Sequence, residues 1–159
     1  MRTIAQAALF LAAINLGVLP VSATWDPNTG DLVRTIEKHG YVVAIEDCDP
    51  GIMGWMNPGK KKMVICNGAD LSNPETHDTV RHEGWHIVQA CKAGPGSLDP
   101  VLTKREDFVQ FVEGGLPQQT IDMVIRTYPQ DRHAIELEAW TAARVLSADQ
   151  VITALNTHC

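Results

Sequence analysis

Five consecutive residues, His82-Glu83-Gly84-Trp85-His86, have the types and the spacing of a metal site that could activate water. Residues four apart lie on one face of a helix, so His82 and His86 can bind one metal ion with two imidazoles. Glu83 leans toward the same place, where its carboxylate can act as general base on a metal-bound water. The motif therefore predicts a metal centre that carries its own base.

The residues around this motif predict the helix that it needs. Asn73 is a suitable N-cap, and Pro74 is a suitable first helical residue. The stretch 76–90 contains no proline, and it carries an apolar stripe formed by Val80, Ile87, Val88 and Ala90. The alternative interpretation is a surface helix whose two histidines are solvated.

The motif resembles that of the zincin metallopeptidases, in which a third protein ligand completes the zinc site and one position is left for water. The metzincin continuation is missing, because Gln89 and Lys92 stand where that class has Gly and His. The Asp-containing signature of the aspzincins is also missing. The chain resembles instead the gluzincins, whose third ligand is a Glu in a later helix, commonly within an E-x-x-A pattern.

The segment that fits this pattern is Glu136-Leu137-Glu138-Ala139, which begins fifty residues after His86. The resemblance implies that Glu136 is the third zinc ligand. Glu138 is the alternative, since side chains two positions apart face different sides of a helix and only one of them can reach the metal. Trp140 departs from the pattern, because several such families have there an Asp or Asn that orients a ligand histidine.

The resemblance implies a zinc-dependent peptidase that acts on a protein or peptide. In that mechanism Glu83 takes a proton from the metal-activated water and passes it to the leaving amine. The oxyanion needs a donor besides the metal, and the candidates are Tyr128, His133 and His77.

A second hypothesis is a disulfide-stapled secreted binding protein whose metal site is structural or vestigial. The substitution Glu83→Gln distinguishes the two, because only a peptidase has turnover to lose. An oxidoreductase or a hydrolase of other substrates remains a third hypothesis. The sequence specifies neither the cleavage preference nor the oligomeric state.

The first 23 residues have the pattern of a secretory signal peptide. A basic start, Met1-Arg2, precedes an apolar run over 4–18 and a small-residue cleavage signal, Val21-Ser22-Ala23. A membrane anchor is the alternative, but the run is shorter than the roughly twenty apolar residues of a span. The pattern predicts a secreted or periplasmic protein with a single domain over residues 24–159 and no membrane span after cleavage.

The four cysteines all lie in the predicted mature part, and an even count in an exported chain favours two disulfides. Three pairings are possible, and we favour Cys48–Cys66 with Cys91–Cys159. A thiolate zinc site is the weaker interpretation, since no C-x-x-C pair occurs. The formal net charge of −6 argues against a protein that binds nucleic acid, because nucleic acid is itself negatively charged.

The pattern of the whole chain predicts an α+β domain, in which a small antiparallel sheet is followed by a mainly helical, zincin-like core. A short helix over 32–38, capped by Asp31 after a loop over 25–30, comes first. Strands are expected over 41–45, 52–56 and 62–66. After the helix of the motif, a breaker over 94–97 is followed by four helices. Two are expected to open with capping boxes, at Thr103 with Glu106 and at Ser147 with Gln150. One begins at Pro117, with Ile121, Val124 and Ile125 facing inward, and one is capped by Asp131.

Overall fold

The structure is a computed structural model that describes residues 27–66, 72–94 and 101–159. The predicted signal peptide over 1–23, much of the connection between sheet and motif helix, and the breaker residues 95–97 lie outside the described residues. The described part contains six α-helices and one three-stranded sheet, which confirms the α+β class.

Helix α1 spans Pro27–Lys38 and begins earlier than the sequence predicts. The predicted loop over 25–30 is wrong from residue 27 onward, because the apolar stripe of the helix extends one turn further back, to Thr29, which is 1% exposed. Asp31 therefore lies inside the helix, where it pairs with Arg34 instead of capping the helix.

The sheet consists of β1 (Val42–Glu46), β2 (Gly54–Asn57) and β3 (Lys62–Cys66), in the order β1-β3-β2. Strands β2 and β3 form an antiparallel hairpin, whereas β1 and β3 run parallel. The prediction of an antiparallel sheet is therefore wrong for the β1–β3 pair. After β1, the chain crosses to the far edge of the sheet and forms β2 there. The turn between β2 and β3 then reverses the chain, so β3 lies between the other two strands and runs in the same direction as β1.

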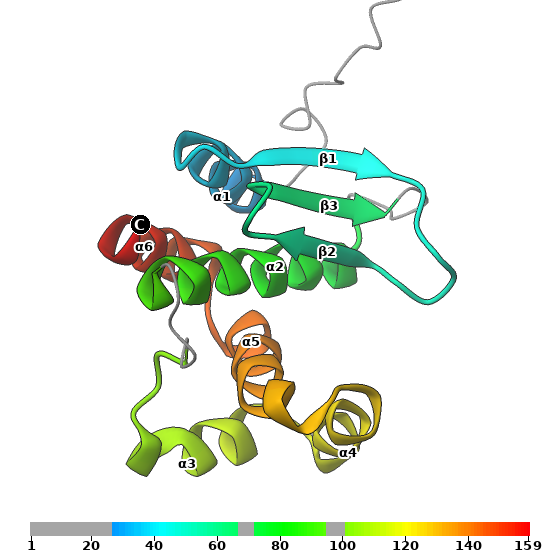
Figure 1. Ribbon diagram of the computed structural model, residues 1–159, viewed down its shortest axis with the longest axis vertical. Coiled ribbons are helices and arrows are strands. Elements are labelled where there is room, and N and C mark those ends of the chain that lie inside the picture. The colour runs from blue at the N-terminus through cyan, green and yellow to red at the C-terminus, as the bar shows by residue number, and fades with distance from the viewer. Residues whose placement is uncertain (1–26, 67–71, 95–100) are drawn as a thin grey trace, which may run out of the picture.

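Helix α2 spans Pro74–Ala93 and contains the whole motif. The predicted start is confirmed, because the Asn73 side chain accepts a hydrogen bond of 2.9 Å from the backbone N–H of Glu75. Gly94, with a φ of 63°, follows the last helical residue. The helix runs beneath the sheet in Figure 1, so one of its faces meets β2 and β3.

The second half of the chain is helical: α3 (Arg105–Gly115), α4 (Gln118–Thr127), the 3₁₀ turn η2 (Gln130–Arg132), α5 (His133–Val145) and α6 (Ala148–His158). The capping box at Ser147 and Gln150 is confirmed. The one at Thr103 is wrong, because Lys104 is the N-cap residue of α3 and makes no capping bond through its side chain. Asp131 is also not a cap, since it lies within η2.

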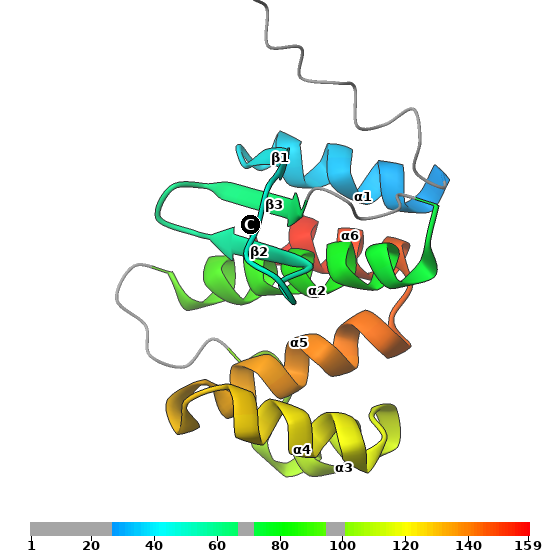
Figure 2. The same cartoon turned by 90° about the vertical axis from the view of Figure 1, so that its right-hand side faces the viewer.

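Two hydrophobic clusters divide the described residues into two layers. The large cluster takes residues from α1, the sheet, α2 and α6, together with Ala139 and Ala142 of α5. The small cluster combines α3 and α4 with another face of α5, through Val112, Leu116, Val124 and Leu137. Figure 2 shows these layers stacked, with α1, α2 and α6 on one side of α5 and with α3 and α4 on the other. Ile125, expected to point inward, is 48% exposed.

Two disulfides, Cys48–Cys66 and Cys91–Cys159, join the pairs that the sequence favours. The first ties the chain after β1 to the end of β3. The second ties the last turn of α2 to the chain end after α6. Both lie in the large layer. No helix in the described ranges is long and apolar enough to cross a membrane.

Candidate metal centre

Two neighbouring helices bring His82, His86 and Glu136 together in a buried group that could hold a metal ion. Both histidines come from α2, one turn apart, and their Nε2 atoms lie 3.1 Å from each other. Glu136 comes from the first turn of α5, and its Oε2 lies 3.5 Å from Nε2 of His82 and 3.3 Å from Nε2 of His86. Each of the three residues is less than 10% exposed.

These distances fit a tetrahedral metal. Ligand atoms about 2.0–2.1 Å from a zinc ion, at tetrahedral angles, are about 3.4 Å from one another. Three lone pairs that converge in a buried place repel one another unless a cation or a proton lies between them. The donor set of two imidazoles and one carboxylate is one that zinc accepts in catalytic sites. The residues present therefore fit the ion that the motif predicts.

Gln89 orients His86. The Nδ1 atom of His86 lies 2.7 Å from Oε1 of Gln89, on the side of the ring opposite the metal group. The amide nitrogen of Gln89 donates to the carbonyl of Ile135 at 3.1 Å and to Oε2 of Glu138 at 2.8 Å. A hydrogen bond of this kind fixes the tautomer and the orientation of a ligand histidine.

Glu138, the alternative third ligand, does not join the metal group. It is fully buried, and its carboxylate accepts hydrogen bonds from four donors, namely the side chains of Trp85 and Gln89 and the backbone N–H groups of Leu102 and Thr103. The two glutamates of the E-x-E segment thus face different partners, as their spacing predicts.

Arg132 and the two histidines stabilise the charge of Glu136. The guanidinium of Arg132 donates to Oε1 of Glu136 at 3.1 Å, which leaves Oε2 turned toward the histidines. Burial alone would raise the pKa of Glu136, but its hydrogen bonds to His82 and His86 outweigh burial and hold the pKa far below its usual range. Glu136 is therefore ionised, as a metal ligand must be.

Glu83 lies beside this group and is 7% exposed. Burial raises its pKa to about 7, while the charge of His86 lowers it and the charge of Glu136 raises it by less. A carboxylate with a pKa near neutrality can both accept and release a proton at working pH. A buried carboxyl group with a raised pKa therefore lies beside the candidate metal ligands.

The two histidines differ in their surroundings. Burial lowers the pKa of His82, although Glu136 opposes the effect. Burial acts in the same direction on His86, but there the contacts with Glu136 and the charge of Glu83 outweigh it and raise the pKa. The Nδ1 atom of His82 is buried without a hydrogen-bond partner, and its ring meets Trp140 edge-on with centroids 5.1 Å apart.

The three candidate oxyanion donors lie in different places. Tyr128 is half-buried, and its pKa is raised first by burial and then by the charges of Glu136 and Glu83, so its phenol is within electrostatic reach of the metal group. His133 is engaged elsewhere, because its Nε2 lies 2.8 Å from the backbone carbonyl of Tyr128. His77, in the first turn of α2, is not part of the metal group.

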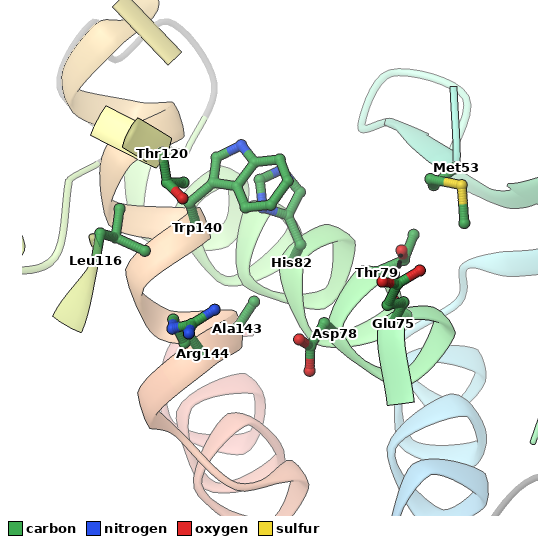
Figure 3. Close-up of a pocket in the computed structure, with 10 residues that line it drawn as sticks. All are labelled: Met53, Glu75, Asp78, Thr79, His82, Leu116, Thr120, Trp140, Ala143 and Arg144. Carbon is green, nitrogen blue, oxygen red and sulfur yellow. Dashed lines mark hydrogen bonds between the residues drawn. The ribbon is translucent and has the colours of Figure 1, made fainter. Parts of the chain in front are cut away.

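Cavities flank the metal group on both sides. The larger, of about 350 Å³, opens beside His82 between α2 and α5 and is shown in Figure 3. Its walls combine apolar side chains, among them Met53, Leu116 and Trp140, with polar residues of the first turns of α2 and of the helices opposite. The smaller, of about 190 Å³, lies beside His86 and is lined also by Met56 and Arg132. Met53 lines the larger cavity and Met56, in β2, lines the smaller, so this segment of the chain borders both.

The closeness of β2 to α2 depends on Gly54. A Cβ atom at this position would lie 2.8 Å from Cγ2 of Thr79 and 2.9 Å from the carbonyl oxygen of Val64, and 3.5 Å from Cγ of Glu83. Only glycine allows the strand to approach the helix this closely. Strand β2, an edge strand of the sheet in the described residues, therefore lies beside Glu83.

Two residues with roles at this site, Gln89 and Arg132, are not identified by the sequence analysis. A signal for Gln89 existed in its spacing, since residues three apart in a helix are neighbours and an amide at that distance from His86 can reach its ring. Arg132 stands four residues before Glu136, which is ion-pair spacing in a helix, although here the helix begins only after it.

Comparison with protein-family models, with curated proteins and with solved structures gave no match. The interpretation of the site therefore rests on its own geometry. That geometry is a buried group of two histidines and one glutamate that could hold a metal ion, with a second glutamate beside it.

Proposed function

We propose that the protein is a secreted, zinc-dependent peptidase of the gluzincin type. The observation that carries the proposal is the arrangement of His82, His86 and Glu136, whose ligand atoms converge within 3.5 Å while the Glu83 carboxylate is buried beside them. Two disulfides agree with an oxidising compartment outside the cytoplasm.

The roles of the residues follow from their surroundings. When bound, zinc supplies a Lewis acid that polarises a carbonyl group and acidifies water. Glu83 accepts a proton from the attacking water and returns it to the leaving nitrogen, and its burial, which raises its pKa, supports its role as the base. Tyr128 is the best placed of the three donors for the oxyanion, because its phenol is close enough to feel the charges of Glu136 and Glu83.

A peptide is the substrate that the surroundings favour. The outer edge of β2 pairs with no strand of the described sheet, and an extended peptide can add to such an edge through backbone hydrogen bonds. The strand runs between the two cavities, so side chains on both sides of the metal have a place to bind. This arrangement supports hydrolysis of a bond inside a bound chain segment.

The test combines metal content with turnover of the oxidised protein. We expect one zinc per chain in the wild type and in Glu83→Gln, and loss of zinc in Glu136→Ala. We expect hydrolysis of a dye-labelled casein by the wild type, reduced by about 10²–10⁴-fold in Glu83→Gln, since that change removes the base. Glu113→Gln, an exposed glutamate of α3, is the matched control and should change neither readout.

The outcomes separate the hypotheses. Zinc bound without turnover of casein or of a mixed peptide library would reject the peptidase and favour the disulfide-stapled binding protein with a structural metal. Absence of zinc from the wild type would reject both metal functions.

A further inference from the structure

We propose that Glu138 is a positioning residue of the metal centre, which acts through Gln89 to fix the face that His86 presents to the metal. The inference rests on the metal site of the proposed function and not on peptide hydrolysis. It assigns a role to a buried carboxylate that neither binds the metal nor faces the cavities.

Both carboxylate oxygens of Glu138 accept hydrogen bonds. Oε1 accepts from the backbone N–H of Thr103 at 2.5 Å. Oε2 accepts from Gln89 at 2.8 Å, from the backbone N–H of Leu102 at 3.1 Å and from the indole N–H of Trp85 at 3.2 Å. A carboxylate with no exposed surface is stable only when such donors replace its hydration. Its position is therefore fixed by donors from two other segments of the chain, α2 and residues 102–103.

This carboxylate determines which way the Gln89 amide points. The amide nitrogen has two hydrogens, and they meet two acceptors, Oε2 of Glu138 and the carbonyl of Ile135. A rotation of the amide by half a turn would place its oxygen against both acceptors, which is repulsive. The amide oxygen must therefore face His86, where it lies 2.7 Å from Nδ1.

The orientation of Gln89 in turn determines the tautomer of His86. An amide oxygen can only accept, so Nδ1 of His86 carries the proton. The lone pair of His86 is then on Nε2, which faces Nε2 of His82 and Oε2 of Glu136. The chain of contacts from Glu138 through Gln89 thus presents His86 to the metal as a ligand and not as a donor.

A double-mutant cycle tests this chain of contacts, with zinc affinity measured by chelator competition. Gln89→Met keeps the size of the side chain and removes the contact with His86, so we expect affinity to fall by about 10–100-fold. Glu138→Gln should lower affinity by about tenfold in the wild-type background, because a neutral oxygen holds the Gln89 amide less firmly. The double variant should match Gln89→Met alone. Gln110→Met and Glu113→Gln, both exposed, are the controls.

A purely structural Glu138 predicts a different result. Glu138→Gln would then lower the affinity by the same factor in both backgrounds, or would leave it unchanged in the wild type, and either result overturns the proposal. Unchanged affinity in Gln89→Met overturns it as well.

A second measurement needs no variant and no zinc. In the metal-free protein, at a pH where His86 is neutral, ¹⁵N chemical shifts should show the proton of His86 on Nδ1. A proton on Nε2 would overturn the proposal. A protein that binds no zinc would overturn this proposal together with the proposed function, whereas bound zinc with the Nδ1 tautomer but without turnover of casein would reject only the peptidase.

Discussion

The two layers that meet at the metal group are built differently. The layer of α1, the sheet, α2 and α6 has the larger hydrophobic cluster and contains both disulfides. The layer of α3, α4 and the start of α5 has a cluster of four buried residues and, within the described ranges, no cross-link. His82 and His86 belong to the first layer. Glu136 comes from the helix that joins the two.

The candidate metal ligands are therefore divided between the cross-linked layer and the helix that joins it to the other layer. The histidine pair and Glu83 are carried by a helix that packs against α1, α5, α6 and the sheet and is tied to the chain end by a disulfide. The third ligand stands near the start of α5, close to Tyr128 and Arg132, where only packing and hydrogen bonds hold the chain. We expect the small layer to open more readily than the large one, since local stability follows buried contacts and cross-links.

The largest expected effect comes from removal of the cross-link between α2 and α6. Cys91→Ala with Cys159→Ala opens a loop of 68 residues, and the chain-entropy relation predicts a loss of about 4 kcal/mol in the free energy of unfolding. Cys48→Ala with Cys66→Ala opens 18 residues and should cost about 3 kcal/mol. Denaturant unfolding measures both, and a larger loss from the shorter loop would contradict the comparison.

A second effect concerns the boundary between the layers, where Glu83 is buried. Burial raises its pKa from 4.5 to about 7, so between these values the unfolded chain releases a proton that the folded, metal-free protein keeps. The free energy of unfolding therefore falls as the pH rises through this range. Glu83→Gln removes the penalty, and above pH 7 we expect the variant to be more stable than the wild type by on the order of 3 kcal/mol.

The check on this effect is urea unfolding of both metal-free proteins across the pH range. Below pH 4.5 the carboxyl is protonated in both states, so the advantage of the Gln variant should vanish there. An equal advantage at every pH would show that the change acts through packing and not through the charge of Glu83.

The smallest effect comes from a matched pair of core substitutions. Val151 in α6 and Val124 in α4 are both fully buried, one in each layer. Each change to Ala should cost about 2 kcal/mol. Hydrogen exchange should show faster opening of α3, α4 and α5 in Val124→Ala, with weaker zinc binding, whereas Val151→Ala should leave zinc affinity unchanged. Equal effects on zinc affinity would contradict the division of the layers.

Rules that act over a few residues predict much of this molecule. The spacing of the two histidines and the Asn73-Pro74 start place the motif on one face of α2. The Ser147 capping box is another local feature that the structure confirms. Such features need only the chain's own geometry, so the sequence contains all the information that decides them.

Features that depend on distant segments could not be derived in the same way. The parallel pairing of β1 with β3 depends on the path between strands, which no local pattern specifies. The favoured Cys48–Cys66 pairing nevertheless agrees with it, because the parallel register places Glu46 opposite Cys66 and leaves Cys48 nearby. Glu138 likewise finds its donors in Leu102 and Thr103, some 35 residues away in sequence.

The side chain that orients a candidate ligand histidine lies in α2 and not in α5. The gluzincin pattern directs attention to position 140, where this chain has Trp140 and no side chain that orients a ligand. The role falls instead to Gln89, on the same helix as His86 and one turn further along. A side chain with that role can come from any element within reach, so its position is less constrained than that of a ligand.

Gly54 determines how closely β2 approaches the candidate metal site on α2. A residue with any side chain would bring its Cβ within 2.9 Å of Thr79 and Val64, where ordinary contacts begin at about 3.4 Å, so the strand would have to move outward. An extended peptide that pairs with β2 would lie at a distance from the candidate ligands of α2 that Gly54 determines. No larger residue fits at this position unless the strand moves.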